Sequence, residues 1–281
     1  MKGPMTMKAL TAREVQLGEL EVLRKLDEIC AQLDLRYFLT YGTLLGAVRH
    51  QGFIPWDDDV DVMMPRPDYD KLIEYLQSHE KELAPLKLMH YSTNKKYIYP
   101  ISRFADTRYW IDYEGATDYG LGLFVDIYPL DGCGNTAEQA EKIMESNKLD
   151  ITMMDIAGKD KYKTSVSGGF LRSAAKLVAY WYAKLCGARY FARKLDKKGR
   201  KYKYDECDYV NLTIWSTTEK YFKKEWFAAI ERIQFEDAMF CVPKCYHEIL
   251  TQCYGDYMKL PPEEQQIAHH YYTAYIRDEA E

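Results

Sequence analysis

The sequence predicts an α+β fold, in which a mixed, mostly antiparallel sheet with flanking helices is followed by a largely helical C-terminal half. Three observations support this prediction. The chain begins with a long segment of helical apolar spacing, short runs of strand-forming residues follow up to about residue 131, and long helical segments return after residue 136. We therefore divide the chain into a core over residues 1–135 and a mainly helical region over residues 136–281 that packs on it.

Properties of the whole chain exclude several classes of protein. The 281 residues suffice for one large domain or a domain with an appendage. A net charge of −5 argues against nucleic acid as a partner of the whole molecule. The N-terminal residues are polar, and no apolar run reaches the roughly 18 residues of a membrane span. We therefore expect a cytoplasmic protein without a signal peptide or a transmembrane helix.

The first expected element is a long amphipathic helix from Thr11 to about Asp34. Thr11 and Glu14 have the spacing of a capping box, in which each residue satisfies a backbone N–H of the first turn. Apolar residues then recur at helical spacing, so one stripe of the helix should face the core.

A turn that could bind phosphate is expected next. Residues 36–40 have the composition of a short strand, Gly42 and Thr43 predict a turn, and residues 44–50 predict a helix that ends at Gly52. Glycine at such a turn allows backbone N–H groups to approach a phosphate closely, and the start of a helix favours an anion.

The segment Asp57–Asp61 is the most unusual in the chain, because four of its five residues are aspartate and an apolar run typical of a strand follows. Side chains alternate along a strand, so Asp59 and Asp61 are expected to share a face. Converging carboxylates repel each other unless a cation lies between them, and Mg²⁺ or Mn²⁺ suits such oxygen ligands. A solvated acidic turn is the alternative, which the following apolar run disfavours.

The remainder of the core is expected to alternate between a helix and strands. Asp68 should cap a helix that runs to about Ser78. Four further strands are expected, over residues 86–91, 97–105, 108–113 and 123–130.

Two charged residues stand inside these apolar strands. Asp126 is an isolated acid, and a buried unpaired carboxylate would be costly, so it needs a partner such as the metal implied by Asp59 and Asp61. Arg103 is interpreted either as a surface residue or as an arginine that faces a phosphate.

The second half begins with a helical segment over residues 136–157. Residues 169–203 then carry eleven Lys or Arg and one acid, together with many aromatic residues. A basic amphipathic helix of this kind is typical of peripheral binding to an anionic membrane, here the inner face of the cell membrane. A helix packed on the core with a solvated basic face would give the same pattern.

The last part of the chain is expected to return to mixed structure. Strands are predicted over residues 208–216 and within 226–241, with a turn at residues 235–237. A helix over residues 243–254 should end at Gly255. A final helix should contain His269 and His270, which are interpreted as surface or substrate-adjacent residues.

The order of these signals resembles a known enzyme core. A Gly-Thr turn before a helix, a strand with Asp-x-Asp and a later strand with a third Asp resemble the polymerase-β-type nucleotidyltransferase fold. Three longer segments, YGTLLGAVRHQGFIPWDDDVDVMMPR, FVDIYPLDG and VPKCYHEILTQCYGDYMKLPP, resemble the LicD family of phosphocholine transferases, and more distantly the fukutin-related transferases. The resemblance extends from the first helix to about His270 and is weakest over residues 136–203.

The resemblance implies a metal-dependent phosphotransferase. Its substrates would be CDP-choline and a sugar hydroxyl of a cell-surface glycan, of the teichoic acid or lipopolysaccharide type, or the lipid-linked precursor of that glycan. By position, Asp59, Asp61 and Asp126 would be catalytic and would hold Mg²⁺ or Mn²⁺, and Asp126 could also accept the proton of the acceptor hydroxyl. Four further residues would contact the phosphates of the donor: Gly42, Thr43, Arg49 and Arg103.

Recognition of choline itself is not shown by any spacing, although its quaternary ammonium would need aromatic neighbours. Six aromatic residues lie near the motifs in the sequence: Tyr41, Trp56, Tyr99, Trp110, Tyr113 and Tyr128.

Three alternatives stay open at this point. The same site could use CDP-ribitol, CDP-glycerol or a nucleoside triphosphate. A glycosyltransferase could bind a sugar nucleotide through Asp-x-Asp, but this leaves Gly42, Thr43 and Asp126 unexplained. A non-catalytic binding protein is disfavoured because all three carboxylates are present.

Overall fold

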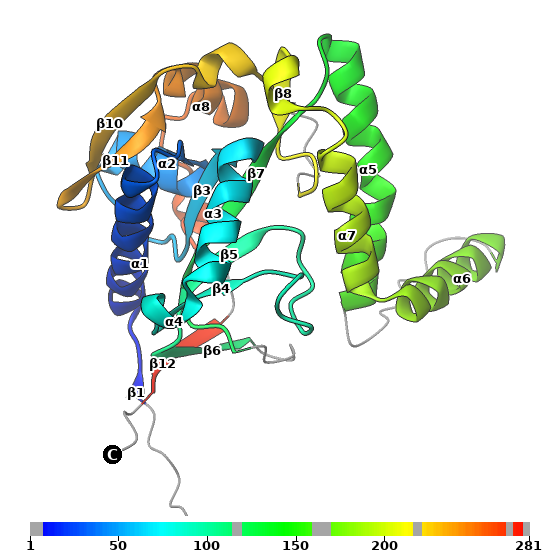
Figure 1. Cartoon of the computed structure of the whole chain (residues 1–281), viewed down its shortest axis with the longest axis horizontal. Coiled ribbons are helices and arrows are strands. Elements are labelled where there is room, and N and C mark those ends of the chain that lie inside the picture. Colours follow the sequence, from blue (N-terminus) through cyan, green and yellow to red (C-terminus); the bar gives the residue numbers. More distant parts are fainter. Residues whose placement is uncertain (1–7, 114–119, 159–169, 216–220, 268–271, 278–281) are drawn as a thin grey trace, which may run out of the picture.

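The computed structural model describes residues 8–113, 120–158, 170–215, 221–267 and 272–277. A seven-stranded sheet forms its centre (Figure 1). Five strands follow the order β2 (Phe38–Leu39), β3 (Val60–Pro65), β7 (Leu123–Gly132), β5 (Ser102–Asp106) and β4 (Leu86–Met89), while β8 (Tyr209–Asn211) pairs with β7 and with β9 (Phe222–Lys223). Only β3 and β7 run parallel, so the predicted mixed, mostly antiparallel sheet is confirmed.

Two helices cover one face of this sheet. In α3 (Arg66–Ser78), the Tyr69 hydroxyl lies 2.5 Å from Ser102 Oγ on β5. In α1 (Ala12–Gln32), Gly18 lies against the Leu123 side chain of β7. The β5–β7 register places Ser102 and Leu123 on the same face, so Arg103 and Asp126 point to the other. Figure 1 shows both helices in front of the sheet.

The expected capping box is confirmed at Thr11, but three local predictions were wrong. Helix α2 (Tyr41–His50) begins earlier than expected, so Gly42 and Thr43 form its first turn. It ends at His50, as predicted, but Gln51 and not Gly52 takes the left-handed conformation after it. Asp68 is not a cap, because α3 already begins at Arg66; its carboxylate instead accepts a hydrogen bond from Arg36 Nε at 2.7 Å.

The second half contains more strands than the sequence indicated. The hairpin β10 (Ile230–Phe235) and β11 (Ala238–Pro243) has the expected turn at residues 236–237. A strand that was not predicted, β12 (Tyr272–Ile276), lies between β1 (Lys8–Ala9) and β6 (Tyr109–Tyr113). The shorter α4 (Glu80–Leu83) and α8 (Tyr246–Tyr254) complete the regular elements near the sheet. His269 and His270 lie outside the described residues.

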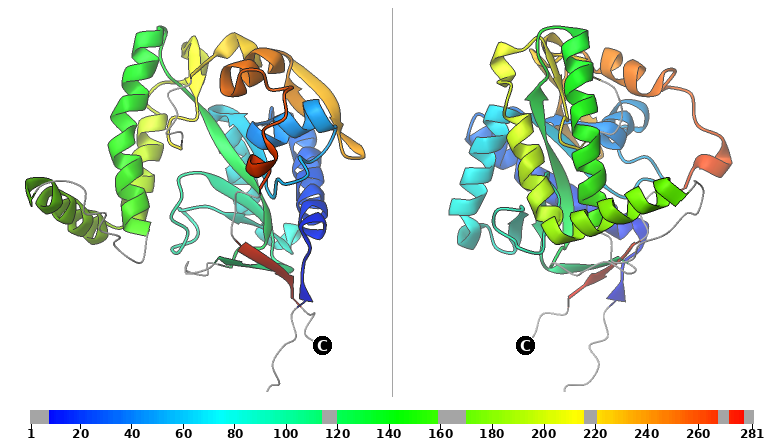
Figure 2. Two further views of the ribbon diagram at one scale, coloured as in Figure 1. Left: turned by 180° about the vertical axis from the view of Figure 1, so that it is seen from behind. Right: turned by 90° about the vertical axis from the view of Figure 1, so that its right-hand side faces the viewer.

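The three helices that follow β7 in the sequence form a separate layer. Helix α5 (Ala137–Gly158) packs against α7 (Ala188–Gly199), and α6 (Phe170–Cys186) projects from their end (Figure 2). Gly187, with φ of 78°, divides the basic segment into α6 and α7, where one helix was expected. Among the described residues, no helix has both the length and the apolar composition needed to cross a bilayer.

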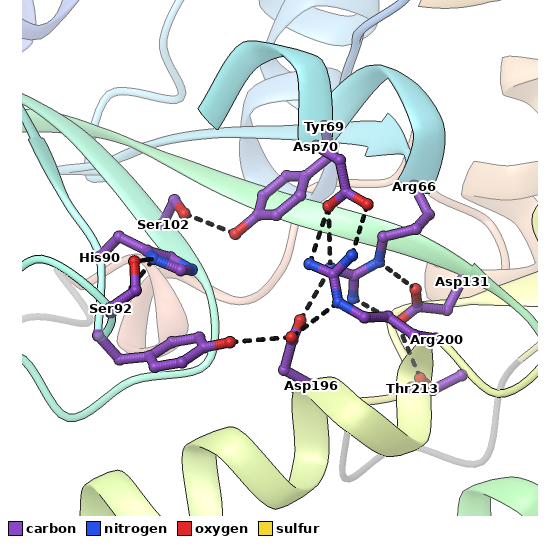
Figure 3. Close-up of polar contacts among 11 residues, drawn as sticks. Arg66, Tyr69, Asp70, His90, Ser92, Ser102, Asp131, Asp196, Arg200 and Thr213 are labelled. Carbon is purple, nitrogen blue, oxygen red and sulfur yellow. Dashed lines mark hydrogen bonds and ion pairs between the residues drawn. The ribbon is translucent and has the colours of Figure 1, made fainter. Parts of the chain in front are cut away.

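A buried ion network fixes α7 to the sheet (Figure 3). Arg66 donates from Nε and Nη2 to both oxygens of Asp131 on β7, at 2.6 and 3.0 Å, and from Nη1 to Asp196 on α7 at 2.9 Å. Arg200 Nε and the Tyr91 hydroxyl also donate to Asp196, each at 2.8 Å. Charges this deeply buried are tolerated because each is paired and hydrogen-bonded.

Candidate active site

The face of the sheet opposite α1 and α3 carries the acidic residues singled out in the sequence. Asp61 on β3 is the direct neighbour of Asp126 on β7 in the parallel ladder, and both are buried. Residues paired across a ladder point to the same face, so the structure brings these two predicted ligands together. Asp59 lies one residue before β3 and is half-buried.

The segment before β3 adds further carboxylates to this point. Ligand oxygens of Asp57, Asp58 and Asp59 all lie within 4.8 Å of one another. Oxygen ligands at this spacing suit a hard divalent cation. The structure thus groups Asp59 with Asp57 and Asp58, whereas Asp59 was expected to act with Asp61 and Asp126.

The N-cap and first turn of α2 hold this acidic strand in place. Thr43 is buried, and its Oγ1 accepts a hydrogen bond from the backbone N–H of Asp61 at 2.9 Å. Thr40 N–H donates to the carbonyl of Asp61 at 3.1 Å. A Cβ on Gly42 would lie 2.3 Å from Asp57 Oδ2, so only glycine fits there without displacing that carboxylate. Thr43 and Gly42 thus position the aspartates.

Arg103 is not a surface residue, which was one of its two interpretations from sequence. It is buried, and its Nε and Nη2 donate to the two oxygens of Asp126 at 2.6 and 3.3 Å. Its guanidinium carbon also lies 4.2 Å from the ring centroid of Phe124. Arg103 therefore supplies the partner that buried Asp126 requires and fixes the orientation of its carboxylate.

A cleft of about 810 Å³ opens beside the acidic residues. Gly42, Asp57, Asp59 and Asp61 line it on one side, and residues 254–267 contribute the opposite wall. Its size falls within the range of small-molecule sites in proteins.

Arg49 lies in the wall of this cleft. Its Nη1 donates to the carbonyl of Tyr257 at 2.9 Å and its Nε donates to His50 Nε2 at 2.9 Å. Within the described ranges, no carboxylate lies within ion-pair distance of Arg49, so its charge is available to an anion in the cleft.

Aromatic rings border the acidic residues on two sides. Tyr128 lies between Tyr41 and Trp215, with ring centroids at 5.5 and 6.0 Å, and Trp215 continues to Tyr99 at 5.8 Å. Trp56 lines the cleft instead. Trp110, also considered from sequence, stacks on Tyr275 in the three-stranded sheet, whereas the side chain of Tyr113 lies outside the description. Trp215 was missed because it is distant in sequence from every motif.

Burial and crowding make the ionised carboxylates unfavourable without a cation. Burial raises the pKa of Asp61, and the nearby Asp59 and Asp126 carboxylates raise it further. One oxygen of Asp61, Oδ1, is buried and has no hydrogen-bond partner. Such an orphaned oxygen fits a site in which Asp59, Asp61 and Asp126 could hold a divalent metal ion.

The sequence analysis missed one acidic residue of this region, Glu19 on α1. It is completely buried, and burial together with four nearby aspartates raises its pKa well above the usual value. A signal was present, because Glu19 lies four residues after Val15 and four before Leu23, inside the apolar stripe of the helix.

Comparison with known proteins agrees with this arrangement of elements. Residues 34–147, which contain β2, β3, β5 and β7, match the family model described as "LicD/FKTN/FKRP, nucleotidyltransferase domain". The chain is 34% identical to the lipopolysaccharide cholinephosphotransferase LicD of Haemophilus influenzae, over 96% of this chain and 100% of that protein. A shorter match, 38% identical over 22% of this chain and 23% of the other protein, is to the uncharacterized protein RP689 of Rickettsia prowazekii.

Proposed function

Because this chain belongs to the LicD family of transferases, we propose that it transfers phosphocholine from CDP-choline to a sugar hydroxyl. The acceptor would be a cell-surface glycan of the lipopolysaccharide or teichoic acid type, or its lipid-linked precursor. The observation that carries the proposal is the pairing of Asp61 with Asp126 beside a cleft, in a chain that is 34% identical over 96% of its length to a cholinephosphotransferase.

The donor set supports a requirement for Mg²⁺ or Mn²⁺. All candidate ligands are carboxylate oxygens, which these hard cations prefer, and the unpartnered Oδ1 of Asp61 gives a cation an open position. Asp59, Asp61 and Asp126 would hold the ion. When bound, it would lower the pKa of the acceptor hydroxyl and neutralise charge on the transferred phosphoryl group.

In the proposed reaction, the acceptor oxygen forms a bond to the phosphorus that carries choline, and the bond from that phosphorus to the bridging oxygen breaks, so that CMP leaves. The chain mainly positions the reactants and compensates charge. Arg49 in the cleft wall would face the diphosphate. Asp126 is better suited to orientation than to proton acceptance, because both of its oxygens already accept hydrogen bonds from Arg103.

Metal-dependent release of CMP tests the proposal. The protein is incubated with CDP-choline and a glycolipid acceptor, with Mg²⁺, with Mn²⁺ or with EDTA. We expect release that needs both the metal and the acceptor. Asp59→Asn should lower the rate by about 100-fold or more, because it removes a ligand charge. Asp34→Asn is the matched control, since Asp34 takes a left-handed conformation that asparagine also adopts readily.

The same assay separates the alternative donors. Release of CMP from CDP-ribitol or CDP-glycerol, but not from CDP-choline, would support the proposed site but show that a different alcohol is transferred. Release of pyrophosphate from a nucleoside triphosphate would replace the proposal by nucleotidyl transfer.

The α6 helix supports peripheral contact with an anionic membrane. Val178, Trp181 and Leu185 lie on one side of the helix and are 70%, 64% and 87% exposed. An apolar helix face that projects from the body is typical of binding at a lipid surface (Figure 2). On α7, by contrast, Lys194 and Lys198 pair with Asp150, each at 2.7 Å, so part of the basic charge is already used inside the protein.

Sedimentation with vesicles tests this contact. Wild-type protein should sediment with vesicles that contain anionic lipid. A variant with Val178, Trp181 and Leu185 changed to serine should stay in solution. Leu149→Ser on α5 is the control, because Leu149 is similarly exposed, at 64%. Equal sedimentation of the triple variant and the wild type would remove α6 as the membrane contact.

A further inference from the structure

The segment Asp57–Asp59 has no regular secondary structure of its own. It follows a turn at residues 55–56 and ends one residue before β3, so neither a helix nor a strand fixes its backbone. Its carboxylate oxygens nevertheless lie within 4.8 Å of one another. Carboxylates at this spacing repel each other, so the segment needs contacts with other elements to keep them together.

Two side chains from distant parts of the chain donate hydrogen bonds to consecutive carbonyls of this segment. Gln16 Nε2 on α1 donates to the backbone oxygen of Asp57 at 2.8 Å, across a separation of 41 residues. The hydroxyl of Tyr272 on β12 donates to the backbone oxygen of Asp58 at 2.7 Å, across a separation of 214 residues. The position of the segment is therefore set in part by α1 and by β12, near the two ends of the chain.

Both donors are themselves held in place. Gln16 is 5% exposed, and its Oε1 accepts a hydrogen bond from Arg13 Nη1 at 3.1 Å. A guanidinium cannot accept and a carbonyl cannot donate, so both contacts of Gln16 require the same orientation of its amide. Tyr272 lies on the middle strand of the sheet β1-β12-β6. Donors on such rigid elements restrict the segment more than donors on loops would.

Asp59 lies between two fixed points of the backbone. On one side, the carbonyl of Asp58 is held by Tyr272. On the other side, the N–H of Asp61 donates to Thr43 Oγ1 at 2.9 Å. Asp59 itself lines the cleft. A short stretch held at both ends leaves its carboxylate few directions in which to point.

We propose that Gln16 and Tyr272 are positioning residues of the active site, which hold the segment before β3 so that the carboxylate of Asp59 stays directed at a divalent cation. The inference rests on the proposed function, because it takes Asp59 as a ligand of that cation. A ligand that is held in place before the ion arrives loses less conformational freedom on binding. The two hydrogen bonds should therefore raise the affinity of the site for metal.

The test measures metal binding directly, without relying on turnover. Mn²⁺ binding to the wild type and to single variants is followed by electron paramagnetic resonance of the free ion and by titration calorimetry. Tyr272→Phe removes only a hydroxyl, and Gln16→Met removes the donor from a side chain of similar length. We expect each to bind Mn²⁺ about 10-fold more weakly. Tyr37→Phe is the matched control, because its hydroxyl donates to Asp27 at 2.6 Å, and it should bind Mn²⁺ as the wild type does.

Thermal unfolding without metal separates positioning from stability. Each of the three variants loses a hydrogen bond, so each should melt about 2–4 °C below the wild type. Gln16→Met and Tyr272→Phe should lose Mn²⁺ affinity in addition, and Tyr37→Phe should not. A lower melting temperature with wild-type Mn²⁺ affinity in both Gln16→Met and Tyr272→Phe would show a purely structural role and overturn the proposal.

The Asp59→Asn variant keeps this proposal separate from the proposed function. If Asp59→Asn weakens Mn²⁺ binding but Gln16→Met and Tyr272→Phe do not, the positioning role alone is refuted. If all three weaken it and the wild type releases no CMP from CDP-choline, the reaction alone is refuted. If Asp59→Asn binds Mn²⁺ as the wild type does, both are overturned. Should Gln16→Met not fold, the smaller change Tyr272→Phe decides.

Discussion

Arg103 on β5 and Asp126 on β7 face each other across an antiparallel ladder, with the guanidinium of Arg103 donating to both carboxylate oxygens of Asp126. The pair is buried beside Asp61, so its geometry determines which way the carboxylate of Asp126 can point. A planar fork is needed for such a two-point contact, and only arginine among the side chains supplies one.

Replacement of Arg103 by lysine should therefore reduce activity more than stability. Lysine keeps the positive charge but contacts only one oxygen at a time, so Asp126 loses its fixed orientation. We expect the rate of phosphocholine transfer to fall by about 10–100-fold. Arg108→Lys is the control, because Arg108 makes a similar pair with Asp106 at an exposed position. Wild-type kinetics of Arg103→Lys would show that the orientation of Asp126 is not important.

Gly42→Ala should destabilise the protein through Asp57. The new Cβ would lie 2.3 Å from Asp57 Oδ2, which forces that carboxylate to move. We expect a loss of about 1–3 kcal/mol in the free energy of unfolding, measured in urea. In an Asp57→Ala background the obstacle is absent, so the same substitution should cost much less. Equal costs in both backgrounds would mean that a different contact is responsible.

Arg66→Ala should be the most destabilising of the substitutions considered. It leaves Asp131, which is fully buried, and Asp196 without their shared guanidinium. Breaking a buried ion pair from one side costs about 3–5 kcal/mol. Lys203→Ala, which removes an exposed pair with Glu206, should change the free energy of unfolding by less than about 1 kcal/mol. Similar losses for both variants would contradict the role of the network.

His90 should make the fold sensitive to acid. Burial lowers the pKa of His90 from 6.5 to about 4, and its Nδ1 accepts a hydrogen bond from the backbone N–H of Ser92. The folded state therefore binds fewer protons than the unfolded state between these pH values. The contribution of His90 to the free energy of unfolding is fully present above pH 6.5. It is lost as the pH falls towards 4, and the loss reaches up to about 3 kcal/mol.

Comparison with His90→Gln isolates this effect from other groups that titrate in acid. Burial raises the pKa of Asp196, but Arg66 and Arg200 lower it more, so this carboxylate also loses stabilising interactions on protonation. Urea unfolding between pH 7 and pH 4 should show a smaller loss for the variant than for the wild type. Parallel curves would place the acid sensitivity elsewhere.

The local pattern of the sequence was sufficient to predict the two strands that carry Asp61 and Asp126. Alternation and apolar runs predicted β3 and β7, whereas the parallel ladder that joins Asp61 to Asp126 was not predicted. The residues that usually mark the start and end of a helix predicted the helix bounds less well. Gly42 and Thr43 suggested a turn, but α2 already begins at Tyr41, and the hydroxyl of Thr43 accepts a hydrogen bond from Asp61 on β3.

Partners that meet through space could not be predicted from a single sequence. Arg103 and Asp126 are separated by 23 residues, and nothing local indicates that one neutralises the other. Glu19 lies on a helix whose pattern only showed which face is buried, not what that face meets. The strand Tyr272–Ile276 was not predicted, because its partners are at the start of the chain and in β6. The metal and donor contacts assigned by resemblance stay predictions.

The cleft takes one wall from residues 42–61 and the other from residues 254–267. During synthesis the residues of the first wall leave the ribosome early, whereas those of the second wall follow only after most of the chain has been made. A polypeptide interrupted before residue 254 would retain the strands of the central sheet and still lack half of the cleft. Premature termination late in the message should therefore yield a product that cannot compete with the complete enzyme for its donor.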